Sequence, residues 1–146
     1  MTEATFLDSS VMLHAFLKPK RKLTAVEEAV KRAAKNILAK IEDGEPVVTT
    51  VVHLGEVFNI VETRLGLQKC VGLAAWLLTL DNIEVLSVSA DDYEAALPVA
   101  QRYSVSINDA LAYVVMVGRG VNRAYSFDKH FKQLPGIEVL PKIQLT

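Results

Sequence analysis

Short apolar runs alternate along this chain with longer segments of helical periodicity, and this alternation restricts the fold more than any other feature. Five runs have the length and composition of β-strands, at residues 4–7, 47–50, 83–88, 124–127 and 137–140. Six other segments repeat apolar residues at helical spacing, at residues 10–17, 24–42, 51–65, 68–80, 91–103 and 107–118. The strand-like runs show little polar alternation, which is typical of strands covered on both faces. The pattern therefore predicts an α/β fold with helices layered on a parallel sheet.

The length and apolar content predict one globular domain over residues 1–146. The chain has 146 residues, of which 51% are hydrophobic, and no repeat or linker interrupts it. Its single cysteine, Cys70, lies in an apolar helical segment and is expected in the core. The N-terminus lacks the features of a signal peptide, and the most apolar stretch, residues 70–80, is shorter than the roughly 20 residues that span a bilayer. We therefore expect a cytoplasmic protein without a membrane segment.

Four carboxylates, Asp8, Glu56, Asp109 and Asp128, lie beside strongly apolar sequence. Two of them follow strand-like runs, and two lie near the starts of helical segments. In parallel sheets, functional sites form beyond the carboxyl ends of the strands. Acids next to a core need partners, and crowded carboxylates raise one another's pKa unless a cation compensates. Mg²⁺ and Mn²⁺ prefer oxygen ligands, so the four acids are candidate metal ligands.

Each acid also has a purely structural interpretation. Asp8 and Asp128 are placed to cap the helical turns that follow them, and Asp109 fits a capping box with Ser106. Glu56 lies opposite an apolar stripe and can simply face water. Only the four acids taken together favour a functional site.

Other chemistries find little support in the sequence. The three histidines, His14, His53 and His130, lack zinc-site spacing and are expected at the surface or in packing. The chain has no phosphate-binding glycine motif and no G-x-S-x-G elbow. Ser10 stands where a haloacid-dehalogenase-type phosphatase would have its second aspartate.

Four motifs, in order, make the chain resemble the PIN-domain ribonucleases, of the kind found as VapC toxins in prokaryotic toxin–antitoxin pairs. They are LDSSV, HLGEV, RYSVSINDALAY, and AYSFDKHF followed by GIEVL. The resemblance covers nearly the whole chain and implies a three-layer α/β/α sandwich around a five-stranded parallel sheet. It also implies that Asp8 and Asp109 are the main ligands of Mg²⁺ or Mn²⁺, and that Glu56 and Asp128 bind the ion directly or through water.

Hydroxyl groups accompany these acids. The resemblance implies a supporting serine at Ser126, two residues before Asp128, and another at Ser9 or Ser10. Such hydroxyls orient carboxylates by hydrogen bonds.

RNA binding has a weaker signal. The formal net charge is −1, so binding would depend on local patches. Lys18, Lys20, Arg21 and Lys22 form the densest basic cluster, and Lys129 follows Asp128. These residues either contact phosphates or are ordinary solvated side chains. The charged helix at 24–42 and its preceding basic loop depart from the resemblance.

The sequence thus predicts a Mg²⁺- or Mn²⁺-dependent endoribonuclease that hydrolyses RNA phosphodiester bonds. The alternative is a PIN-fold module that binds RNA or protein with little turnover, since the apolar helix at 68–80 should be buried or lie in a subunit interface. A phosphatase is a more remote alternative. The resemblance also implies a homodimer and an antitoxin that inserts a basic side chain among the acids.

Overall fold

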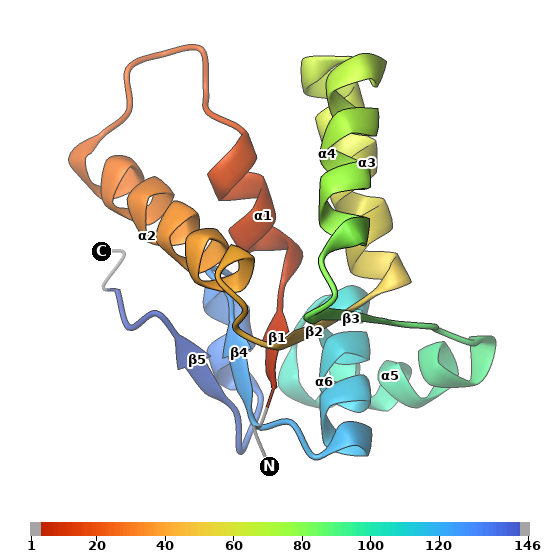
Figure 1. Cartoon of the computed structure of the whole chain (residues 1–146). Helices are drawn as coiled ribbons and strands as arrows, with labels where there is room; N and C mark the ends of the chain where they lie inside the picture. Colours follow the sequence, from red (N-terminus) through yellow and green to blue (C-terminus); the bar gives the residue numbers. More distant parts are fainter. Residues whose placement is uncertain (1–3, 144–146) are drawn as a thin grey trace.

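The computed structural model describes residues 4–143, and its five strands form one parallel sheet (Figure 1). The strands are β1 (Thr5–Leu7), β2 (Val47–Thr50), β3 (Ile83–Leu86), β4 (Arg123–Tyr125) and β5 (Glu138–Leu140). Their order is β3-β2-β1-β4-β5, and every neighbouring pair is parallel. The predicted five-stranded parallel sheet is therefore confirmed, with β1 at its centre.

The helices follow the predicted segments closely. They are α1 (Ser9–Phe16), α2 (Ala25–Glu42), α3 (Val51–Leu65), α4 (Leu67–Thr79), α5 (Ala90–Tyr103) and α6 (Ile107–Arg119), with a short 3₁₀ helix η1 (Lys129–Gln133). The strand predicted at 83–88 ends at Leu86, because the chain turns toward the Ser89 cap of α5. Pro98 lies inside α5 without ending that helix.

Two hydrophobic cores lie on opposite faces of the sheet, because successive strand residues point to opposite sides. Leu7 joins the core formed with α1 to α4, whereas its neighbour Phe6 joins the core formed with α5, α6 and η1. Tyr125 and Ala124 divide in the same way. This arrangement is the three-layer α/β/α sandwich that the resemblance implies.

Local sequence signals set the ends of α2. Thr24 and Glu27 form a capping box at its start, with each side chain bonded to the backbone of the other residue. After Asp43, Gly44 adopts a φ of 117°, which favours glycine, and the chain turns toward β2. These caps confirm the predicted bounds of the helix to within one residue.

Helix α4 is less buried than one of its two predicted placements requires. Cys70 is buried in the core, as predicted, and so is Leu77. However, Leu67, Val71 and Leu78 are 58%, 55% and 60% exposed on a single helical stripe. The prediction that this helix is buried within the chain is therefore wrong. Its placement in a subunit interface stays a prediction.

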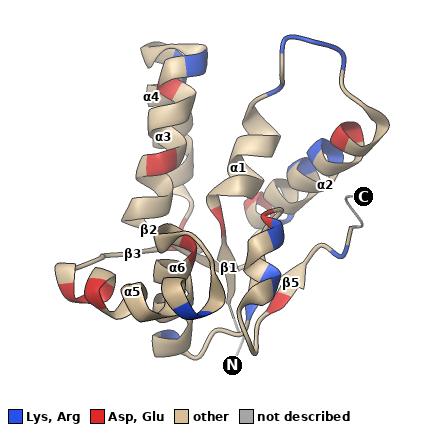
Figure 2. Cartoon of the chain, turned by 180° about the vertical axis from the view of Figure 1, so that it is seen from behind, with Lys and Arg blue, Asp and Glu red and all other residues tan. Residues whose placement is uncertain are grey.

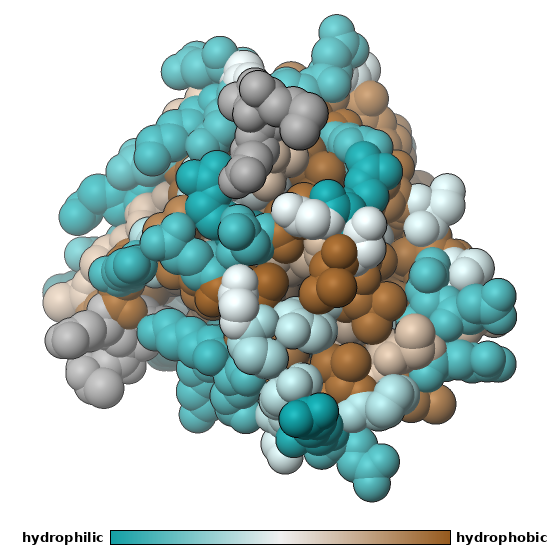
Figure 3. All heavy atoms as spheres, turned by 90° about the horizontal axis from the view of Figure 1, so that it is seen from below, coloured by the Kyte–Doolittle hydropathy of each residue, from teal (hydrophilic) through white to brown (hydrophobic). Residues whose placement is uncertain are grey.

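Apolar groups also reach the surface elsewhere. Figure 3 shows brown groups near the middle of the lower face, bordered by hydrophilic ones.

In the described part of the chain, no helix combines the length and apolar character needed to cross a membrane.

Candidate active site

The carboxyl ends of β1 and β4 bring Asp8 and Ser126 together, although 118 residues separate them in the chain. Asp8 is 3% exposed, and its Oδ2 accepts hydrogen bonds from Ser126 Oγ at 2.8 Å and from Ser10 Oγ at 2.7 Å. Asp8 occupies the N-cap position of α1, but its side chain makes no capping bond. The capping interpretation of Asp8 is therefore wrong, and its carboxylate instead points into a cluster of hydroxyls.

The same serines fix the segment that carries Asp128. Ser126 Oγ accepts from the backbone N–H of Asp128 at 3.1 Å, and Ser10 Oγ accepts from that of Phe127 at 2.9 Å. Asp128 Oδ1 in turn accepts from the backbone N–H of His130 at 2.9 Å, so the expected cap of η1 is present. Ser10 and Ser126 therefore connect Asp8 to the segment that carries Asp128, the first and the last of the four candidate acids.

Asp109 lies in the first turn of α6 and is 6% exposed. Its backbone N–H donates to Ser106 Oγ at 3.1 Å, but no reciprocal bond completes a capping box. Among the described residues, its Oδ2 atom has no hydrogen-bond partner although it is buried. A buried carboxylate oxygen without a partner is costly, which makes this atom a natural ligand for a cation.

Crowding and burial of the acids change their pKa values. Burial raises the pKa of Asp109 to about 8, together with the neighbouring carboxyl groups of Asp128 and Asp8. Burial also raises the pKa of Asp8, against the opposing effects of His53 and the two serine hydroxyls. The charged forms of both acids are thus disfavoured without a compensating cation.

Glu56 lies on the second turn of α3. The residues next to Asp8 and Asp109 in the sequence hold its side chain toward these two acids. Its Oε1 accepts a short hydrogen bond from Ser9 Oγ, and its Oε2 accepts from Asn108 Nδ2 at 3.4 Å. Ser9 follows Asp8, and Asn108 precedes Asp109. Glu56 therefore does not simply face water. Figure 2 shows acidic positions on α3, where β1 meets α1, and beside α6.

Two further residues lie in this cluster, and neither was predicted to be part of it. Asn108 reaches Glu56, and His53 is 1% exposed with its Nδ1 at 2.7 Å from Thr50 Oγ1. Burial lowers the pKa of His53, while the charges of Asp8 and Glu56 oppose that change. His53 packs edge-on against Phe6, which agrees with the predicted packing role. The helical spacing of three residues between His53 and Glu56 was the available signal.

The donor set fits a hard divalent cation. The acids and serines offer only oxygen atoms, and Asp109 contributes an unpartnered one. Among residues 4–143, no three His, Cys, Asp or Glu side chains are already grouped as a metal site. A site without three such side chains in place is still compatible with Mg²⁺. This ion usually takes one or two carboxylates and keeps its remaining ligands as water or substrate phosphate. Asp8 and Asp109 are the two buried carboxylates of the set.

A groove of about 430 Å³ connects this cluster to the predicted basic residues. Its lining begins at Ser10, follows α1 and ends at Lys18, Arg21 and Arg64. Arg21 makes a paired salt bridge with Glu27, with nitrogen–oxygen distances of 2.7 and 2.8 Å. Lys20 and Lys22 are exposed on the loop that joins α1 to α2, and Lys129 is exposed on η1.

Comparisons with known proteins identify the family of this chain. A family model described as PIN domain matches residues 5–137. The 23S rRNA-specific endonuclease VapC20 of Mycobacterium tuberculosis is 35% identical over 101 residues, which cover 66% of this chain and 76% of that protein.

Solved structures give the same result. The crystal structure of VapC20, described as a Sarcin-Ricin loop cleaving toxin, superposes with a TM-score of 0.73 at 28% identity. The superposition covers 94% of this chain and 100% of the VapC20 chain. A toxin–antitoxin complex from Klebsiella pneumoniae has the same fold, with a TM-score of 0.62 at 17% identity over 92% of this chain and 95% of that one. The chain belongs to the PIN domain family, which confirms the resemblance that its motifs carry.

Proposed function

We propose that this protein is a VapC-type endoribonuclease that hydrolyses RNA phosphodiester bonds with the help of Mg²⁺ or Mn²⁺. The observation that carries the proposal is the pair of buried carboxylates, Asp8 and Asp109, whose pKa values are raised and one of which has an unpartnered oxygen. The similarity to an rRNA-specific endonuclease supports RNA as the substrate class.

In this proposal the acids divide the work by position. Asp8 and Asp109 would hold the cation, and Asp128 and Glu56 would join directly or through water. A bound divalent ion supplies activation of a water molecule and stabilises charge that develops on the phosphodiester. Ser10 and Ser126 hold the Asp8 carboxylate in one orientation, and Ser9 does the same for Glu56.

The test is RNA cleavage by the purified protein with Mg²⁺ or Mn²⁺, with and without EDTA. We expect EDTA to stop cleavage and Asp8→Asn or Asp109→Asn to reduce it by at least roughly 100-fold, the upper end of what loss of an outer-shell partner costs. Asp91→Asn, at an exposed acid of α5, is the matched control and should cleave normally. Activity that persists in EDTA or survives both substitutions would overturn the proposal.

A binding module with little turnover is the second candidate, and the exposed apolar stripe of α4 favours it. Metal binding separates the two candidates, because only the enzyme would need a cation held by Asp8 and Asp109. A chain that binds a protein partner but neither Mn²⁺ nor Mg²⁺ would favour the module.

We also infer the setting of the enzyme. We propose that the chain forms one catalytic domain, works in the cytoplasm and pairs with a second copy. An antitoxin with a basic side chain would neutralise the acids much as a cation does. Co-purification with an antitoxin that suppresses RNA cleavage would support this last point.

A further inference from the structure

Positive charge is concentrated in one part of this nearly neutral molecule. Residues 18–42 contain eight of the 16 Lys and Arg residues and only three of the 17 Asp and Glu residues. That segment therefore has a formal charge of +5, and the rest of the chain has −6, for the total of −1. Figure 2 shows blue on the loop between α1 and α2 and along α2, and red on α5. The molecule is strongly polarised.

Two of these eight cations are already occupied by structural contacts. Arg21 pairs with Glu27, and Lys31 Nζ donates to the carbonyl oxygens of His14, Ala15 and Leu17 at 3.0–3.3 Å. The other six are exposed and form no ion pair within the described residues: Lys18, Lys20, Lys22, Arg32, Lys35 and Lys40. Lys40 lies in the last turn of α2. We call the remaining five residues the basic surface.

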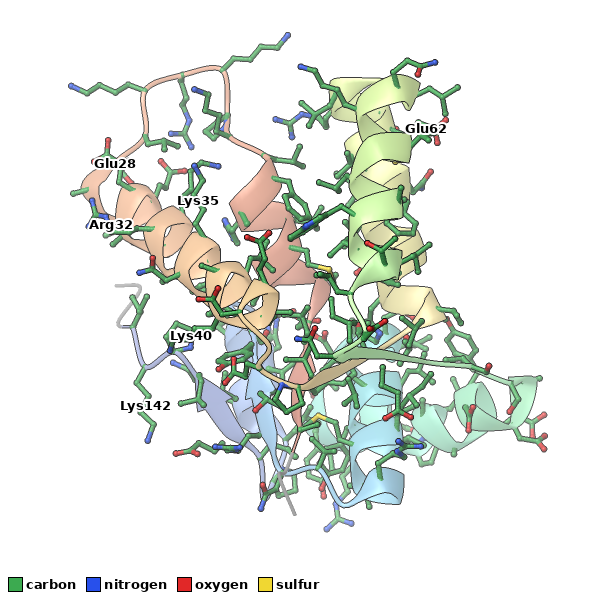
Figure 4. The ribbon with its side chains drawn as sticks, viewed as in Figure 1. Glu28, Arg32, Lys35, Lys40, Glu62 and Lys142 are labelled. Carbon is green, nitrogen blue, oxygen red and sulfur yellow. The ribbon has the colours of Figure 1, made fainter. Side chains whose placement is uncertain are left out.

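The five residues lie on one side of the molecule. Lys31 ties α2 to the end of α1, where the loop begins, and the charges of Lys35 and Lys18 contribute to a lowered pKa of Lys31 after the larger effect of burial. Arg32 and Lys35 line a shallow depression of about 500 Å³ that also includes Leu23 from the loop. Glu28 is the acid among its lining residues. Figure 4 shows Arg32 and Lys35 on the N-terminal half of α2, below the loop.

The basic surface is continuous with the acidic cluster. Lys18 lines the groove that begins at Ser10, and Ser10 Oγ is bonded to Asp8 Oδ2. A polyanion held at the acids can therefore follow the groove to the loop. Arg32 and Lys35 extend the path onto α2, where they lie about 4.5 Å apart along the helix axis. Each strand of a nucleic-acid duplex carries a charge about every 3.4 Å, so this separation is close to the spacing of neighbouring phosphates.

We propose that the basic surface binds the phosphate backbone of a second segment of the substrate RNA, away from the bond that is cleaved. This proposal rests on the ribonuclease function and assigns its substrate class: an RNA with a long or folded flank, preferred over a short single strand. Unpaired like charges repel one another and raise the local potential, so a polyanion relieves a cost that the free protein bears. Such contacts recognise charge and spacing and carry no base specificity.

Binding of labelled RNA in EDTA tests the surface separately from cleavage. The variant is Arg32→Glu with Lys35→Glu, and the matched control is Lys69→Glu with Arg102→Glu on α4 and α5. The probes are a long hairpin RNA and an oligonucleotide that covers only the acidic cluster, each measured over a series of KCl concentrations. We expect the variant to bind the hairpin roughly tenfold more weakly and to lower the salt slope by about 1.4–1.8, from two lost contacts.

The control pair should bind the hairpin like the unmodified protein, and the short oligonucleotide should not distinguish any of the three proteins. Equal hairpin affinity and equal salt slope for variant and control would overturn the proposal. Cleavage of the short oligonucleotide with Mn²⁺ separates this outcome from failure of the ribonuclease assignment. If the protein binds the hairpin through the basic surface but cleaves neither RNA, the ribonuclease assignment is wrong and RNA binding by the basic surface stands.

Discussion

At the scale of single residues, the orientation of Asp8 depends on Ser126. Its hydroxyl donates to Asp8 Oδ2 and accepts from the N–H of Asp128, so one group positions two acids. We predict that Ser126→Ala lowers metal-dependent RNA cleavage by roughly 10- to 100-fold, as loss of an outer-shell ligand partner does. The measurement is kcat/KM on a fixed RNA, with Ser87→Ala, at an exposed serine, as the control. Equal rates for the two variants would contradict this role.

Asp109 makes stability depend on pH. Because its folded pKa of about 8 exceeds the ordinary value of 3.8, the folded protein binds more protons than the unfolded chain between these pH values. The free energy of unfolding in EDTA should therefore fall as pH rises from about 4 to about 8.

The variant Asp109→Asn should remove much of this fall and raise stability at pH 8 by roughly 1–3 kcal/mol, the usual penalty for an unsatisfied buried polar group. Urea unfolding at pH 5 and pH 8 measures both effects. A parallel pH dependence in the variant and the unmodified protein would show that another group is responsible.

How far the site could be predicted depends on the range of its contacts. Asp8 and Asp109 were identifiable because they lie at a strand end and a helix start in a parallel-sheet pattern. Their local sequence could not exclude capping, because an N-cap and a ligand share the same short motif. The deciding contact for Asp8 is Ser126, 118 residues away, and for Glu56 it is Asn108, 52 residues away. No local pattern contains such pairs.

At the scale of secondary-structure elements, Lys31 anchors α2 to α1. Its ammonium group reaches three carbonyl oxygens at the end of α1. We predict that Lys31→Met, which keeps the aliphatic stem, lowers the free energy of unfolding by about 1 kcal/mol. Lys35→Met on the same helix should change it by less than about 0.5 kcal/mol. Thermal or urea unfolding of the two variants measures the difference, and equal losses would refute the anchor.

Element bounds were predictable wherever a local cap sets them. Thr24 with Glu27, and Gly44 after Asp43, fixed α2 from a few neighbouring residues. The strand order and the exposure of α4 were harder, because both depend on which distant elements pack together. When a helix is apolar on all sides, its sequence does not tell whether its outer stripe is covered by the same chain or left at the surface.

At the scale of the whole molecule, that outer stripe predicts self-association. Leu67, Val71 and Leu78 align on the exposed side of α4, and exposed apolar stripes of this kind mark interaction sites. We predict that the protein sediments as a dimer and that Leu78→Glu shifts it to a monomer. Leu97→Glu, at a 52% exposed leucine of α5, is the matched control. Identical sedimentation of all three proteins would exclude α4 as the interface.

If the ribonuclease proposal is right, buried carboxylates from distant parts of the chain form one cation site that serves RNA cleavage. Calorimetric titration with Mn²⁺ at pH 7 tests it most directly. The unmodified protein should bind Mn²⁺ with release of protons, because Asp109 must lose its proton to bind a cation. Binding should be weaker by at least roughly tenfold in Asp8→Asn and in Asp109→Asn, and unchanged in Asp91→Asn. Equal Mn²⁺ affinity in all four proteins would show that Asp8 and Asp109 do not form the cation site.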